Sequence, residues 1–129
     1  GGLQMTLSEA GKELGINLDV ALERFAGNEG LYIKFLNKMR SDPTFAMLEN
    51  AVADRDLSAV ERAAHTLKGV SANLGLDELS VKCADIVQAV RTEGNDAFGH
   101  MDALMETCRQ TYSKMVSILE ELDQGETGC

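Results

Sequence analysis

The chain has 129 residues, of which 44% are hydrophobic and 26% charged, and its formal net charge is −9. This length and composition are typical of a single water-soluble domain that is large enough to bury its own core. The negative charge argues against nucleic acid or an anionic membrane as a partner, because both surfaces are held by clustered lysines and arginines. No apolar run reaches the length of a signal peptide or a membrane-spanning helix, so we expect a cytoplasmic protein.

The chain shows no sign of a second domain, a linker, an internal repeat or a low-complexity tract. We interpret residues 1–4, which precede Met5, as an expression scar, and residues 124–129 as a disordered tail. Residues 5–123 then form one domain, expected to be a monomer because each apolar stripe can be covered inside one bundle. The absence of a kinase or receiver segment favours a free-standing protein over a domain of a larger sensor kinase.

The three cysteines are odd in number, and none of them has the spacing of metal ligands. Cys83 and Cys108 fall on apolar helical stripes, so we expect them to be buried, reduced thiols. Cys129 ends a polar tail and is expected to be an exposed free thiol. The sequence therefore predicts no metal site.

Every segment with a clear hydrophobic period predicts a helix, and none alternates convincingly at period two. A short first helix is predicted over residues 7–13, with Thr6 or Ser8 as its N-cap. A second helix is predicted over residues 18–25, with Gly27 ending it. The inner face of this second helix would consist of Leu18, Ala21, Leu22 and Phe25. Further N-caps are predicted at Asn17, Asn28 and Asp56.

A third helix follows Asn28, and the tripeptide Ser41-Asp42-Pro43 leaves two interpretations of where it ends. Proline after aspartate suits the N-cap and first residue of a new helix, and it equally suits a kink within one long helix. In both cases the apolar stripe continues to about Arg55. The predicted stripe residues before and after the proline are Leu31, Tyr32, Phe35, Leu36 and Met39, and then Phe45, Leu48 and Val52.

The rest of the chain predicts three long helices. One follows the cap Asp56 and ends near Gly75, the next runs from Asp77 to Gly94, and the last covers residues 96–122. Their apolar stripes are Val60, Ala64, Leu67, Ser71 and Leu74; Leu79, Cys83, Ile86 and Val90; and Met101, Leu104, Met105, Cys108, Tyr112, Met115, Leu119 and Leu122. Long amphipathic helices with short connections predict an all-α fold, an antiparallel four-helix bundle with a short N-terminal helical extension.

The most informative residue is His65, one of only two histidines, in the segment Ala-His-Thr-Leu-Lys-Gly-Val-Ser-Ala-Asn-Leu-Gly of residues 64–75. At about 100° per residue, His65 points roughly 140° away from the centre of the buried stripe, so it is predicted to face water. Lys68 and Gly69 follow one turn later on the same side. That side of the helix also carries Arg62 and Ala72. An exposed imidazole among cations and small residues suits a group that carries phosphate and is approached closely by another protein.

The pattern His-x-Leu-Lys-Gly-x-Ser-x-x-Leu-Gly resembles the histidine phosphotransfer (HPt) domain of two-component phosphorelays, specifically over residues 63–79 and more loosely over residues 7–122. The resemblance implies that His65 accepts a phosphoryl group from a receiver-domain aspartate and passes it to another receiver aspartate. It implies partners among the receiver domains of response regulators or hybrid sensor kinases. It also implies no cofactor and no kinase or phosphatase activity, because the Mg²⁺ and the acidic pocket belong to the receiver.

The residues around His65 suit this chemistry. A histidine is partly neutral near pH 7 and can attack as a nucleophile. Lys68 can offset the charge of a phosphoryl group, which is roughly −1.5 to −2. Gly69 removes a Cβ that would obstruct a partner, at a cost in helix propensity, and Ala72 extends the low surface.

One position departs from the family pattern. Many HPt domains carry Gln or Glu where this chain has Val87, and that side chain hydrogen-bonds near the histidine ring. Here Gln88 follows one residue later, about 100° further round the helix. Either Gln88 takes over this role through a helix rotation, or another group orients the ring. Arg91 is expected on the same face, as a docking or phosphate contact.

Two other functions compete with a phosphorelay. One is a helical adaptor that binds a receiver or another protein without carrying phosphate. The other is an enzyme that uses His65 as a general base, which needs a pocket and a partner acid. The second histidine, His100, has no glycine or lysine at helical spacing, so we interpret it as a surface or boundary histidine.

Overall fold

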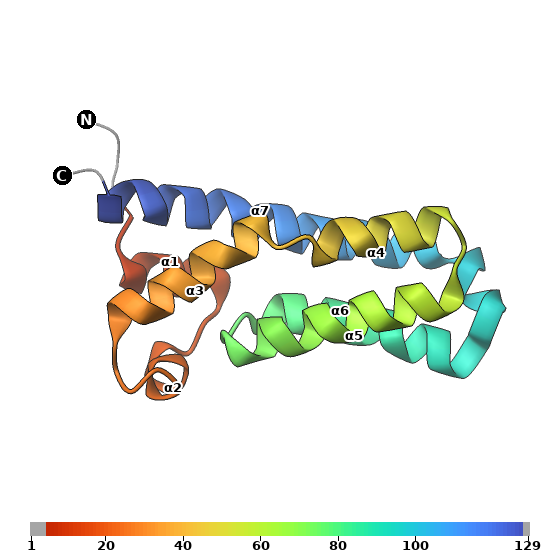
Figure 1. Ribbon diagram of the computed structural model, residues 1–129, viewed down its shortest axis with the longest axis horizontal. Coiled ribbons are helices and arrows are strands. Elements are labelled where there is room, and N and C mark those ends of the chain that lie inside the picture. Colours follow the sequence, from red (N-terminus) through yellow and green to blue (C-terminus); the bar gives the residue numbers. More distant parts are fainter. Residues whose placement is uncertain (1–4, 128–129) are drawn as a thin grey trace.

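The computed structural model describes residues 5–127, and the surroundings of side chains up to Leu122. All regular structure in this part of the chain is helical. The elements are α1 (Leu7–Leu14), α2 (Leu18–Glu23), α3 (Glu29–Ser41), α4 (Thr44–Ala53), α5 (Leu57–Asn73), α6 (Asp77–Glu93), the 3-10 helix η1 (Gly94–Gly99) and α7 (Met101–Thr127). Figure 1 shows α3 and α4 end to end beside α7, with α5 and α6 on the other side of the bundle. The predicted all-α bundle with a short N-terminal helical extension is confirmed.

Side-chain caps fix where several helices begin. Thr6, and not Ser8, caps α1, since the Thr6 hydroxyl accepts from the Glu9 N–H at 3.1 Å. The Glu9 carboxylate in turn accepts from the Thr6 N–H at 3.2 Å, which completes a reciprocal capping box. Each of the other predicted caps accepts an N–H from the first turn of its helix, and these caps are Asn17, Asn28 and Asp56.

The chain breaks at Pro43, so α3 and α4 are separate helices. Asp42 has an extended backbone, with φ −69° and ψ 127°, because a proline ring disfavours the helical conformation of the residue before it. The Asp42 carboxylate accepts a hydrogen bond from the Thr44 N–H at 2.7 Å and satisfies a donor at the start of α4. Of the two interpretations that the sequence allowed, the new helix is the one observed.

The predicted apolar stripes of α5 and α6 are buried throughout, since no residue of either stripe is more than 4% exposed. The stripe of α7 is buried apart from Leu104 and Tyr112, which are half-buried at its edge. The Tyr112 ring stacks on Phe45 of α4 with 4.1 Å between ring centroids. Helix α5 packs mainly against α4 and α6, so its buried stripe faces them and its polar side faces outward.

The predicted stripe of α3 is wrong at two positions. Leu31 and Phe35 are each 39% exposed, and Ile33 is buried in their place. The observed inner face runs through Tyr32 and Leu36, and each exposed residue lies about 100° to one side of it. An apolar set that covers more than half of a helix cannot all face one core.

The second helix is shorter than predicted, because it ends at Glu23 and not at Phe25. The chain leaves it through left-handed backbone at Ala26, with φ 53°, and Gly27, with φ 74°. Of its predicted inner face, Ala21 is buried, and the half-buried members are Leu18, Leu22 and Phe25.

The last helix starts and ends later than predicted. Residues 94–99 form η1, which Gly94 enters with φ 58°, and His100 separates it from α7 with φ −132°. Buried Ala97 holds this turn against the core. Helix α7 continues to Thr127, so residues 124–127 of the predicted tail are helical. Residues 1–4 and 128–129 lie outside the described part of the chain.

The turn between α5 and α6 is anchored by the N-terminal helices. The Tyr32 hydroxyl donates to the Leu74 carbonyl at 2.6 Å, and burial raises the pKa of Tyr32 to about 12. Gly75 takes φ 79° in this turn, a conformation that glycine adopts without strain. One Nη of Arg24 donates, at 2.9 and 3.1 Å, to the last carbonyls of α5, those of Ala72 and Asn73.

The two described cysteines are buried free thiols, as predicted. Cys83 on α6 and Cys108 on α7 form a hydrogen bond with each other, which together with burial raises the pKa of Cys83. Cys83 is therefore held as an uncharged thiol. Cys129 lies outside the described residues.

Candidate functional site

Helix α5 presents His65 on its outer side. The neighbours Ala64 and Leu67 are buried, with exposures of 0% and 1%, and they fix the rotation of the helix. His65 is exposed, as its position relative to the buried stripe predicts. In the described part of the chain, the imidazole makes no hydrogen bond or ion pair, so both ring nitrogens are available for chemistry.

The surface one turn beyond His65 is low. A Cβ on Gly69 would meet no atom within 4 Å, so this position opens directly to solvent. Lys68 is half-buried, and its carbonyl accepts from the Ser80 hydroxyl at 3.1 Å, which ties α5 to α6 at this turn. Ala72 is exposed and adds no bulk beyond Gly69.

His65 shares an open depression of about 250 Å³ with side chains of α5 and α6, namely Ser58, Glu61, Arg62 and Arg91. The Arg91 Nε donates to a Glu61 carboxylate oxygen at 2.7 Å. The structure thus brings the predicted residues Arg62 and Arg91 to His65, and it adds Glu61, which was not among the predicted site residues. The signal for Glu61 was its spacing, since it precedes His65 by four residues and so lies on the same helix face.

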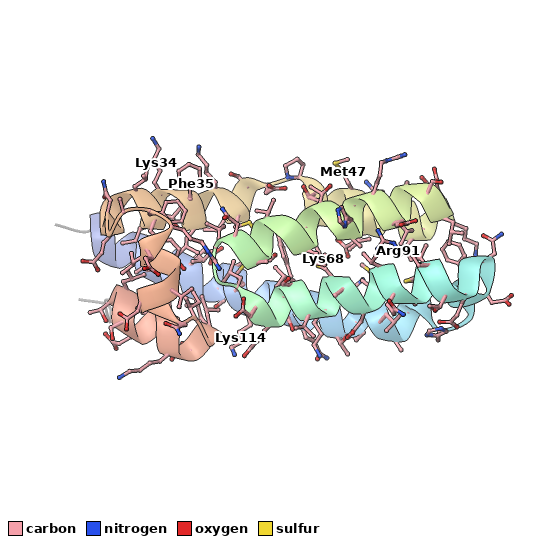
Figure 2. All side chains as sticks on the ribbon, turned by 90° about the horizontal axis from the view of Figure 1, so that it is seen from below. Lys34, Phe35, Met47, Lys68, Arg91 and Lys114 are labelled. Carbon is pink, nitrogen blue, oxygen red and sulfur yellow. The ribbon has the colours of Figure 1, made fainter. Side chains whose placement is uncertain are left out.

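The other side of His65 is more apolar. A groove between α4 and α5 is lined by Thr44, Met47, Ala59, Arg62, Ala63 and Thr66. A second groove, between α3 and α5, includes Phe35, Gly69 and Val70. Met47 is 57% exposed, and Phe35 and Val70 are 39% and 36% exposed. Figure 2 shows Met47, Lys68 and Arg91 on the side of the molecule that α4, α5 and α6 form.

The two α6 residues at which this chain departs from the family pattern, Val87 and Gln88, differ in exposure. Val87 is 3% exposed and belongs to the core, whereas Gln88 is exposed. Gln88 makes no side-chain hydrogen bond to His65 in the described structure, and its backbone carbonyl accepts from the Thr92 hydroxyl at 2.8 Å. The helix is therefore not rotated so as to pair Gln88 with the ring.

His100 lies apart from this site, at the junction of η1 and α7. It is exposed, as predicted, and its Nε2 lies 2.8 Å from a Glu93 carboxylate oxygen. Among the described residues, no three His, Cys, Asp or Glu side chains are arranged to hold a metal ion. No helix in the same part of the chain is both long and apolar enough to cross a membrane.

Residues 31–125 match the Hpt domain family. The match extends from α3 into α7, which is most of the chain, so the protein belongs to the Hpt domain family. Helices α1 and α2 precede the matched region. A search of curated proteins and a search of solved structures each found no match. Membership implies histidine phosphotransfer within a phosphorelay, by domains that interact with receiver domains and are carriers, not kinases.

Proposed function

We propose that the protein is a phosphorelay intermediate in which His65 accepts a phosphoryl group from one receiver aspartate and passes it to another. The observation that carries this proposal is the exposed imidazole, which has no partner among the described residues, beside the open surface at Gly69 in a chain of the Hpt family. His65 lies on an open surface and not in a deep cleft. This geometry disfavours the alternative of a general-base enzyme.

In this proposal, phosphoryl transfer requires no metal ion or cofactor bound to this chain. A lone pair on one ring nitrogen of neutral His65 forms the N–P bond while the O–P bond to the receiver aspartate breaks. The aspartate leaves as a carboxylate, and the proton on the other ring nitrogen stays in place. In the second transfer a different receiver carboxylate attacks phosphorus and the neutral imidazole leaves. The receiver supplies Mg²⁺, and Arg62 and Lys68, which have no ion-pair partner among the described residues, offset the phosphoryl charge.

We propose that a receiver domain docks on the exposed side of α5 and on the grooves on either side of this helix. The low surface at Gly69 and Ala72 admits the loops around a receiver active site, and exposed Met47 and Phe35 offer apolar contacts. Gln88, exposed on α6, is available to the partner and not to the ring. We expect a small, transient interface in the cytoplasm, made by a monomer, because a relay has to release each receiver.

The test is transfer from a phosphorylated receiver in the presence of Mg²⁺, followed by assay for acid-labile, alkali-stable phosphate. His65→Gln should lose all label, and the matched variant His100→Gln should keep it. Label retained by His65→Gln, or lost from His100→Gln alone, would contradict the assignment. A wild-type protein that binds several receivers without taking label would favour the adaptor.

A further inference from the structure

The ion pair between Arg91 and Glu61 joins α6 to α5 directly beside His65. Its Nε–Oε2 distance is 2.7 Å, and all three side chains line the same depression. Among the described residues, this is the one contact of the Arg91 guanidinium, so both of its Nη groups have no acceptor in the protein. The side chains of Arg91 and Glu61 are 53% and 37% exposed, which leaves both free to exchange partners.

Some of the charged side chains around His65 form an ion pair and others do not. On α5 they are Glu61, Arg62 and Lys68, and α6 contributes Arg91. Helix α4 contributes only the uncharged Thr44 and Met47 to the adjoining groove. Arg62 and Lys68 have no ion-pair partner among the described residues. Glu61 is the one anion among the described residues that line the depression, and it is paired with Arg91.

A phosphoryl group on His65 would change this balance. It brings a charge of roughly −1.5 to −2 to a position one helical turn from Glu61, where Cβ atoms are about 5–6 Å apart. That charge repels the Glu61 carboxylate and attracts the Arg91 guanidinium, whose planar fork binds phosphate oxygens well. Glu61 and the phosphoryl group therefore compete for the same guanidinium.

We propose that Glu61 is a positioning residue that withholds Arg91 from the phosphoryl group and so keeps the phosphohistidine ready to donate. This inference rests on the proposed function, in that it takes His65 as the phosphorylated residue. Without Glu61, Arg91 would stabilise the phosphorylated state and slow its discharge to the second receiver. With Glu61 present, Arg91 stabilises the phosphoryl group less, and phosphoryl transfer to and from the receivers stays reversible.

The first measurement requires no receiver. Phosphoramidate phosphorylates histidine as ammonia leaves, so His65 can be loaded chemically in a His100→Gln background. A ³¹P NMR titration then reports the pKa at which the phosphohistidine loses its last proton, the one on its imidazole ring. Glu61→Gln removes a repelling charge and releases Arg91, and both effects favour the dianion. The proton affinity of the phosphohistidine should fall roughly two- to fivefold, the range of exposed charge pairs.

Matched variants separate this effect from a change in net charge or fold. Glu13→Gln alters an exposed residue of α1 by the same charge and should leave the titration of the phosphohistidine unchanged. Arg91→Gln should raise the pKa of the phosphohistidine, and in that background Glu61→Gln should lower it by less than in the presence of Arg91. Equal effects of Glu61→Gln and Glu13→Gln, or strict additivity with Arg91→Gln, would overturn the inference.

The relay gives the second measurement. At equilibrium with a phosphorylated receiver, Glu61→Gln should raise the ratio of phosphorylated protein to phosphorylated receiver roughly two- to fivefold. An unchanged ratio in a working relay would overturn the role of Glu61 and leave the proposed function intact. A shifted titration without transfer from any receiver would count against the proposed function and leave the Glu61–Arg91 competition intact.

Discussion

Replacing Gly69 should make the protein more stable and less active. Gly69 lies in the interior of α5, where glycine costs about 1 kcal/mol relative to alanine. A Cβ at this position meets nothing within 4 Å, so a new side chain projects into solvent without strain. Gly69→Ala should therefore raise the free energy of unfolding by about 1 kcal/mol, and Gly69→Gln by somewhat less.

For a domain of 129 residues, a gain of about 1 kcal/mol should raise Tm by roughly 3–6 °C. Thermal and urea denaturation followed by circular dichroism measure this change. Transfer from a phosphorylated receiver, measured in the same samples by rapid quench, should slow in the order glycine, alanine, glutamine. A displacement of about 1 Å at a reacting centre can cost about 100-fold in rate, so the loss for glutamine should approach that value.

Gly30→Ala is the matched control, because Gly30 is an exposed glycine in the first turn of α3 whose added Cβ makes only an ordinary contact of 3.6 Å. It should leave transfer unchanged. Gly69→Gln with wild-type transfer rates would show that receivers do not approach α5 at this turn. A fall in Tm for Gly69→Ala would refute the argument that the position is open.

The remaining predictions concern stability and the reactivity of buried groups. His65→Gln should change the free energy of unfolding by no more than about 0.5 kcal/mol, because the side chain is exposed and has no partner in the described part of the chain. Tyr32→Phe should cost about 1–2 kcal/mol, since it leaves the buried Leu74 carbonyl without its 2.6 Å donor. Because the pKa of Tyr32 is raised to about 12, the contribution of its hydroxyl to the free energy of unfolding is complete below pH 10 and is lost as the pH rises to 12. Urea titrations at alkaline pH should show a smaller loss of stability in Tyr32→Phe than in the wild type. In a Cys129→Ser protein, the core thiols are both 0% exposed and should react with Ellman's reagent only as the chain unfolds, so rapid reaction of the native protein would contradict their placement.

The sequence predicts α5 and α6 well because each has a narrow apolar stripe at regular steps and clear end signals. Asp56 begins α5 and Gly94 ends α6, as their local chemistry requires. The same regularity predicts the exposure of His65, since a residue opposite a buried stripe has to face solvent. The inner faces of α5 and α6, and the rotation of α5 about its own axis, were therefore predictable from the local sequence pattern alone.

Other features depend on tertiary structure and carry weaker local signals. In α3, Leu31 and Phe35 are as apolar as the residues that are buried, so only packing against neighbouring helices decides which of them faces the core. Residues 94–99 lack a helical period, and their 3-10 turn follows from burial of Ala97. Glu61 acquires its role from Arg91, a residue 30 positions away in sequence, and spacing within one helix cannot identify that partner.

The helix that carries His65 packs mainly against the helices that precede and follow it in the chain, α4 and α6. Such contacts close short loops, and short loops cost little entropy when the chain folds. The α5–α6 hairpin can therefore form early, before α1 and α3 close onto α7 from the far end of the sequence. Substitutions in the hairpin should then change the rate of folding, whereas substitutions between α1 and α7 should change the rate of unfolding.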